Sequence, residues 1–210
     1  MSRFLCLVGL LCPVLAVAAE GEDDGSNIPR DFSIGVGVGV AAPTGTLAPN
    51  AASVRFRIDD SVTIEPIIEF GLGNSRERFE QPDNEVVNNA RRTAFQVGAL
   101  GRFQAAERGN VELQALGGAG FGWSSSVDDP EGTENNTTTS GLSASLTWGL
   151  GVNWWVSPNF ALSGDATNPL VGVSSSKSSP EVGDSSSTNS NFGINIGWDP
   201  TVRMMGHVFF

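Results

Sequence analysis

The side chains of this sequence that could do chemistry are ionisable groups at alternate positions of apolar segments. Arg55 and Arg57 precede a very short turn, and Glu65 and Glu69 follow it. Because alternate residues of a strand point to one face, these four groups are expected to form ion pairs across a hairpin. The corresponding face of later segments adds five more ionisable residues: Arg102, Glu112, Asp165, Arg203 and His207. Four arginines can therefore neutralise four carboxylates.

Metal and cofactor chemistry find little support in these residue types. His207 is the only histidine, and the sequence has no H-E-x-x-H motif or histidine cluster that would bind zinc. Both cysteines, Cys6 and Cys12, lie in an apolar leader. An acidic segment has oxygen ligands for a divalent cation, but its spacing is not that of an EF-hand and a solvated loop is the preferred interpretation; it contains Asp128, Asp129, Glu131 and Glu134. We expect no metal site and no cofactor.

The segments that carry the ionisable residues alternate apolar and polar positions, as β-strands with two different faces do. The clearest case runs from Leu142 to Val156, where every second residue is apolar. Inward glycines in the first predicted strand, such as Gly37, would leave room for large side chains of other strands. The whole pattern predicts eight strands, at about 32–40, 53–58, 62–72, 93–103, 111–123, 142–156, 160–173 and 201–210.

The predicted connections alternate strictly in length. Long ones lie near residues 45, 82, 132 and 182, and short ones near residues 60, 107 and 158. Antiparallel barrels of the outer membrane have this arrangement, with short turns in the periplasm and long loops outside. A charged row facing the core would destabilise a soluble sandwich, whereas it suits the polar interior of a membrane barrel.

The final segment, 201–210, resembles the closing strand of bacterial outer-membrane β-barrels. Its apolar positions alternate and end on the terminal aromatic residue; they are Val202, Met204, Val208 and Phe210, with Gly206 as the weak member. In that family this strand is also the signal that the barrel assembly machinery binds. The resemblance therefore implies that these residues form an assembly signal.

Over nearly its whole mature length the chain resembles the small eight-stranded OmpA/OmpX-like outer-membrane barrels. The resemblance implies an all-β, eight-stranded antiparallel up-and-down transmembrane β-barrel with a structural or surface-interaction role and no enzyme activity. It also implies contact with outer-membrane lipid and lipopolysaccharide, with the assembly machinery during biogenesis, and a monomeric state. Eight strands leave room only for side chains or one small ligand, so we expect ion pairs to fill the lumen rather than a general diffusion pore.

The N-terminus reads as a secretory signal peptide. Arg3 precedes an apolar run that ends in small residues, and this run is too short to span a membrane. We expect a cleaved signal peptide at 1–19, a short solvated periplasmic stub at 20–30 and the barrel at 31–210. A formal charge of -11 argues against nucleic acid as a partner.

Two other functions compete with this interpretation. A lipid-modifying enzyme in the same membrane would need catalytic groups around His207; no serine stands two residues after it, although a triad assembled in space is left open. A satisfied lumen histidine beside Arg203 is the preferred interpretation. A soluble lipocalin-like barrel would need a polar outer face, which the apolar runs at 62–72 and 142–156 contradict. An extracellular ligand on the loops is left unidentified.

Overall fold

The computed structural model describes residues 27–29, 32–42, 49–81, 84–130, 136–180, 186–194 and 200–210. They form nine strands: β1 (Ser33–Ala42), β2 (Ala51–Arg57), β3 (Val62–Gln81), β4 (Asn84–Arg108), β5 (Val111–Pro130), β6 (Thr137–Ser157), β7 (Phe160–Pro180), β8 (Ser187–Ile194) and β9 (Thr201–Phe209). No helix among these residues is long and apolar enough to cross a membrane. The predicted signal peptide lies outside the described residues.

Eight of the strands close into an antiparallel ring. Neighbours in sequence pair from β1 to β7, and β9 pairs with both β7 and β1. β8 pairs with the C-terminal half of β7, whereas β9 pairs with the N-terminal half, so β8 and β9 lie one after the other along the same side of β7. The predicted eight-stranded antiparallel barrel is therefore confirmed, with its last position divided between β8 and β9.

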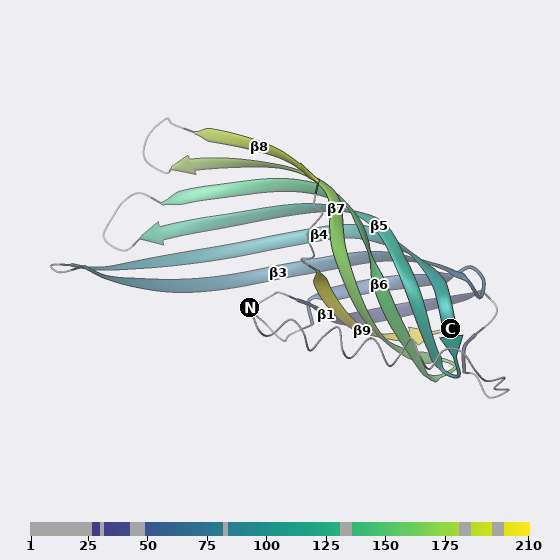
Figure 1. Ribbon diagram of the computed structural model, residues 1–210. Coiled ribbons are helices and arrows are strands. Elements are labelled where there is room, and N and C mark those ends of the chain that lie inside the picture. Colours follow the sequence, from purple (N-terminus) through teal and green to yellow (C-terminus); the bar gives the residue numbers. More distant parts are fainter. Residues whose placement is uncertain are drawn as a thin grey trace, which may run out of the picture.

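Three hairpins extend far beyond the ring at the end opposite the short turns (Figure 1). The segments at 74–91, 124–140 and 174–191 were expected to be loops, and this expectation is wrong for most of their length. For example, β3 and β4 stay in register from Gly73–Arg92 to Gln81–Asn84. An antiparallel ladder can continue past a membrane, because its hydrogen bonds do not depend on an apolar face. We call this the long-hairpin end, and the other the short-turn end.

The two faces of the ring have the polarity of a membrane barrel. Apolar side chains such as Val36, Phe103 and Leu150 are exposed on the outside, while polar and charged side chains such as Arg102 and Glu112 are buried inside. This is the inverse of a soluble lipocalin-like barrel. The residues predicted to form an assembly signal lie on the outer face, where they are exposed; they are Val202, Met204, Val208 and Phe210.

Residues that pair directly across β4, β5 and β6 mark the edge of the apolar belt nearer the long-hairpin end. Phe95, Trp123 and Leu142 are successive partners, and all three are exposed apolar residues. The next outward-facing row consists of hydroxyl residues: Thr93, Ser125 and Ser140. The last apolar row before a polar row is the usual position of aromatic residues that anchor a barrel at the membrane–water interface.

A strong tilt of the strands brings distant residues to the same level of the lumen. We can follow directly paired residues around the ring, starting at Val173 of β7 and passing through β6, β5, β4, β3, β2, β1 and β9. The series returns to β7 at Leu162, which is eleven residues before Val173. One of these positions is a bulge at Leu170, where the register shifts between Leu146 and Thr147 of β6. Closed barrels require such a stagger.

Inward glycines make room for large side chains, as predicted. A Cβ atom at Gly35 would lie 2.7 Å from the ring of Phe209. At Gly37 it would overlap the ring of His207. The glycines of β1 thus allow the aromatic side chains of β9 to enter the lumen.

Gly39 should therefore tolerate a methyl group far less well than an outward glycine. Its Cβ would collide with the backbone oxygen of Met204 and lie 2.6 Å from Cγ of Met205. We expect Gly39→Ala to lower the free energy of unfolding by about 1–3 kcal/mol, which is typical of overpacking. Gly164 is the matched control, because nothing lies within 4 Å of a Cβ built there. Urea unfolding midpoints would measure both, and equal midpoints would contradict the described packing.

Asp59 fixes the turn between β2 and β3. Its Oδ1 accepts hydrogen bonds from the backbone N of Ser61 at 2.8 Å, from Oγ of Ser61 at 2.7 Å and from the backbone N of Val62 at 2.8 Å. Hydrogen bonds from the hydroxyl and the backbone of Ser61 lower the pKa of Asp59, because they stabilise the charged carboxylate.

The lowered pKa of Asp59 gives the turn a pH dependence. The contribution to stability is complete above the unfolded pKa of about 3.9, and it is lost as the pH falls through the lower folded pKa. An NMR titration of the Asp59 carboxyl carbon should give a midpoint below that of an unstructured peptide. Ser61→Ala removes one donor and should move the midpoint upwards; an unchanged midpoint would exclude this hydrogen bond as the cause.

Candidate functional site

Glu65 is the centre of a buried network of charges inside the ring. Its carboxylate is 0% exposed and is paired with Nε of Arg55 at 3.2 Å and with Nε of Arg102. Register explains this arrangement, because Phe56 of β2 faces Ile64 of β3 and so places both Arg55 and Glu65 on the inner face. A carboxylate without water needs such partners to stay charged.

Arg102 connects two carboxylates from opposite sides of the lumen. Besides Glu65 of β3, its guanidinium binds both carboxylate oxygens of Asp165 on β7. It also donates a hydrogen bond of 3.0 Å to Oε1 of Gln114. A planar guanidinium can serve several acceptors at once, which is why arginine suits this position.

A second group of contacts surrounds Glu112 nearer the short-turn end. Nη1 of Arg57 lies 2.8 Å from Oε1 of Glu112, and the guanidinium also lies 5.8 Å from the centre of the Trp155 ring. The other oxygen of Glu112 accepts hydrogen bonds from Nδ2 of Asn153 and Nε1 of Trp155, both at 3.0 Å. Neither Asn153 nor Trp155 was predicted to take part, although both occupy inward positions of β6.

The predicted pairing across one hairpin is only partly right. Arg55 does meet Glu65, but Arg57 binds Glu112 on β5, and Glu69 binds Nε of Arg203 on β9 at 2.8 Å. The tilt of the strands carries the ends of the hairpin apart and brings other strands to the same level. All eight predicted charged groups nevertheless face the lumen and lie in ion pairs.

His207 does not lie beside Arg203 as expected. It is 0% exposed, and its Nε2 lies 2.9 Å from Oγ of Ser53 and 3.1 Å from Oε1 of Glu65. Oγ of Ser53 also donates a 2.6 Å hydrogen bond to Glu65. Nothing in the sequence connected Ser53 with His207, since the two residues stand on different strands.

This contact is not a catalytic triad. In a triad, the serine and the acid bind different nitrogens of the imidazole. Here both groups meet Nε2, while Nδ1 has no hydrogen-bond partner among the described residues. Neither Ser53 nor His207 lines the cavity described below. Both residues are buried, with Ser53 5% and His207 0% exposed.

Apolar side chains close the lumen at the short-turn end. Trp155 and Phe209 have ring centres 4.6 Å apart, and Ile28 and Ala161 are buried with them. The backbone N of Asn27 donates a 2.8 Å hydrogen bond to Oδ1 of Asn110. Residues 27–29 were expected to belong to a solvated stub, but Ile28 is buried; most of the predicted stub, 20–26 and 30, lies outside the described residues.

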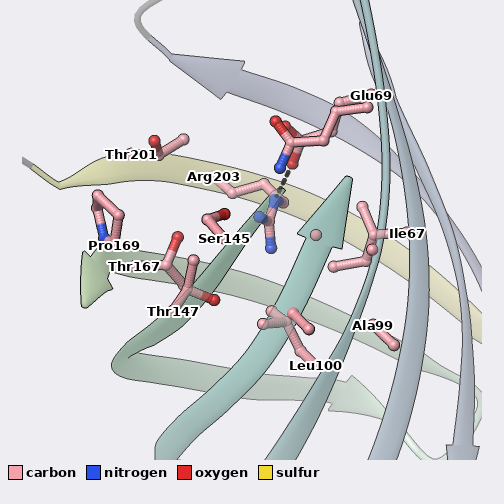
Figure 2. A pocket seen from close by; sticks show the side chains of 14 residues that line it. Ile67, Glu69, Ala99, Leu100, Ser145, Thr147, Thr167, Pro169, Thr201 and Arg203 are labelled. Carbon is pink, nitrogen blue, oxygen red and sulfur yellow. Dashed lines mark hydrogen bonds and ion pairs between the residues drawn. The ribbon is translucent and has the colours of Figure 1, made fainter. Parts of the chain in front are cut away.

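A cavity of about 220 Å³ lies in the lumen on the long-hairpin side of the charge network. Figure 2 shows Arg203 reaching into it from β9, with Glu69 at one side and threonine side chains at the other. Its polar lining consists of Glu69, Gln96, Ser145, Thr147, Thr167, Thr201 and Arg203. The lumen thus combines a closed short-turn end, a neutralised middle and a polar cavity facing the other end.

No metal-binding cluster of three or more histidine, cysteine or acidic residues occurs in the described ranges. Asp128 lies in β5, whereas Glu131 and Glu134 of the predicted acidic loop lie outside the described residues. The solvated loop therefore stays a prediction.

The fold and the polar lumen are those of small outer-membrane β-barrels. A major outer membrane protein from Thermus thermophilus matches 86% of this chain and 99% of its own, with a TM-score of 0.54 and 13% identity. Outer Membrane Protein W of E. coli matches with 86% and 99% coverage, a TM-score of 0.42 and 10% identity. Ail of Yersinia pestis, an attachment invasion locus protein, matches with the same coverage, a TM-score of 0.39 and 17% identity. No protein-family model and no curated protein matches the sequence.

Proposed function

We propose that this chain is an integral outer-membrane β-barrel protein with a structural or surface-interaction role, and that its lumen does not serve as a diffusion pore. The observation that carries the proposal is the network around Arg102, which joins carboxylates of β3 and β7 across the lumen. An apolar outer belt supports insertion in a bilayer, and the long hairpins would then present their polar strands to the exterior. The partners are outer-membrane lipid and lipopolysaccharide, and the assembly machinery during biogenesis; the barrel acts as a monomer.

The proposal predicts that the barrel does not conduct ions. Purified protein inserted in a planar lipid bilayer should show no stepwise conductance at moderate voltage, because an ion would have to cross the paired charges and the apolar seal of Trp155 and Phe209. The native protein should also be recovered from outer membranes and migrate differently before and after boiling. Steady ion conductance, or recovery as a soluble periplasmic protein, would contradict the proposal.

We further propose that the protein is not an enzyme. The buried position of Ser53 and His207 and their contact through a single imidazole nitrogen support this. Cells that carry His207→Ala should therefore contain the same lipid A species as cells with the unchanged protein, as measured by mass spectrometry. A changed acylation pattern would favour the lipid-modifying alternative.

A further inference from the structure

The lumen cavity is lined by an arginine, Arg203, that has one buried donor atom without a hydrogen-bond partner among the described residues. Arg203 is only 6% exposed, and its Nε donates to Glu69. Its Nη1 is buried without a hydrogen-bond partner in the described structure, 3.6 Å from Oδ2 of Asp165. Arg203 extends into the cavity (Figure 2), and an oxygen atom within reach of Nη1 would satisfy a buried donor that otherwise costs free energy.

The charges around Arg203 determine what kind of oxygen fits. Two carboxylates, Glu69 and Asp165, already flank its guanidinium. An anion in the cavity would be repelled by both, and a cation would lie against Arg203 itself. Among the described residues, the buried ion pairs of the lumen join four arginines to four carboxylates, so an added charge would have no partner there. An uncharged ligand avoids these costs.

The remaining lining favours hydroxyl groups in particular. Besides Glu69 and Arg203, the polar part of the lining consists of four hydroxyl side chains and one amide, and Ile67, Leu100 and Pro169 contribute apolar surface; the polar groups are Ser145, Thr147, Thr167, Thr201 and Gln96. Hydroxyl and amide groups both donate and accept hydrogen bonds, so they match a ligand that also does both. A volume of about 220 Å³ is smaller than the roughly 300–1,000 Å³ of pockets for drug-sized ligands.

We propose that this cavity binds a small uncharged polyhydroxyl compound, of the size of one monosaccharide, which enters from the long-hairpin end. A ligand hydroxyl oxygen accepts from Nη1 of Arg203, and neighbouring ligand hydroxyls bond to Glu69 and to the threonines. The closed short-turn end makes this a binding site without a through path. The direction of entry rests on the proposed function, whereas the class of ligand rests on the lining alone.

The test is saturation-transfer NMR with the full mature protein in micelles of a detergent that has no sugar headgroup. The probes are D-glucose and myo-inositol, with D-gluconate and D-glucosamine as charged analogues. We expect the neutral probes to bind and the charged analogues to bind at least tenfold more weakly. Binding of none of the probes, or equal or tighter binding of a charged analogue, would overturn the inference.

Two threonine variants separate a binding role from a structural one. Thr147→Val and Thr167→Val keep the shape of the side chain and remove one hydroxyl, so each should weaken binding of a neutral probe by about three- to tenfold. Thr138 is the matched control, because it lies exposed on the distal part of β6 and does not line the cavity. Unchanged binding in both lining variants would also overturn the inference.

The binding test can fail independently of the proposed function. Conductance and membrane localisation report on the barrel and its blocked lumen, and they do not depend on the cavity being occupied. A silent, membrane-inserted protein that binds no probe would leave the proposed function standing and remove only the ligand. Heat-modifiable gel mobility of every variant confirms that the barrel is folded before binding is measured.

Discussion

Replacing Arg102 by methionine should lower the free energy of unfolding by about 3–5 kcal/mol, the range measured when one partner of a buried ion pair is lost. Methionine fills much of the same space but leaves Glu65 and Asp165 without the cation that joins them. Among the ion pairs of the described residues, Asp165 would keep the one with Nη1 of Arg203 at 3.6 Å. Equilibrium urea unfolding in phospholipid vesicles, followed by tryptophan fluorescence, would measure the change.

An exposed arginine provides the control for this substitution. Arg91 lies exposed on β4, so Arg91→Met should change the free energy of unfolding by no more than about 0.5 kcal/mol. Adding Asp165→Asn to Arg102→Met should restore part of the loss, because one of the two unpaired carboxylates becomes neutral. Indistinguishable unfolding of Arg102→Met and Arg91→Met would show that the network does not stabilise the barrel.

Deleting Phe210 should reduce the amount of folded protein in the outer membrane by about tenfold. Its ring is 81% exposed on the outer face, where it contributes nothing to the core but is free to bind another protein. Loss of a phenylalanine from an apolar receiving site costs about 1.5–3 kcal/mol, and about 1.4 kcal/mol corresponds to a factor of ten in binding. The fraction with unboiled, folded mobility in outer-membrane preparations would measure the effect.

A substitution at Phe32 is the control that distinguishes loss of C-terminal recognition from loss of an exposed aromatic residue at the rim of the barrel. Its side chain is also exposed, at 61%, just before β1 begins. Phe32→Ala should therefore cost lipid contact without affecting an assembly signal, and most of the protein should still fold in the membrane. Equal losses from the deletion and from Phe32→Ala would show that Phe210 acts only as an interfacial anchor.

The sequence was sufficient to predict the membrane-belt part of each ring strand and which side chains face inwards there, since both follow from a local period of two. The eight charged groups and His207 were placed in the lumen on this basis alone. Their partners were harder to predict, because the pairing of Arg57 with Glu112 depends on the stagger of the whole ring. Ser53 and Trp155 gave no signal, since a serine and a tryptophan at inward positions are compatible with many neighbours.

The distal hairpins illustrate a different limit of the sequence. Beyond the apolar belt, both faces of a strand carry polar residues, such as Ser125 and Thr138, so the apolar–polar alternation disappears. Without that alternation, a loop and a continued ladder have similar composition, and only the backbone pairing of β5 with β6 distinguishes them. Sequence periodicity thus identifies the part of a strand that lies against lipid, and it underestimates the strand's length.

The bulge at Leu170 shifts the alternation of inward and outward side chains in β7 by one residue. Leu162 and Val173 both face outwards although an odd number of positions separates them, so the extra residue at the bulge has moved the second half of the strand by one step. Elsewhere in the belt, an insertion or deletion of one residue would turn every later side chain to the wrong face. Natural variation in strand length should therefore come in steps of two within the belt, and single-residue changes should collect at the bulge and in the distal hairpins.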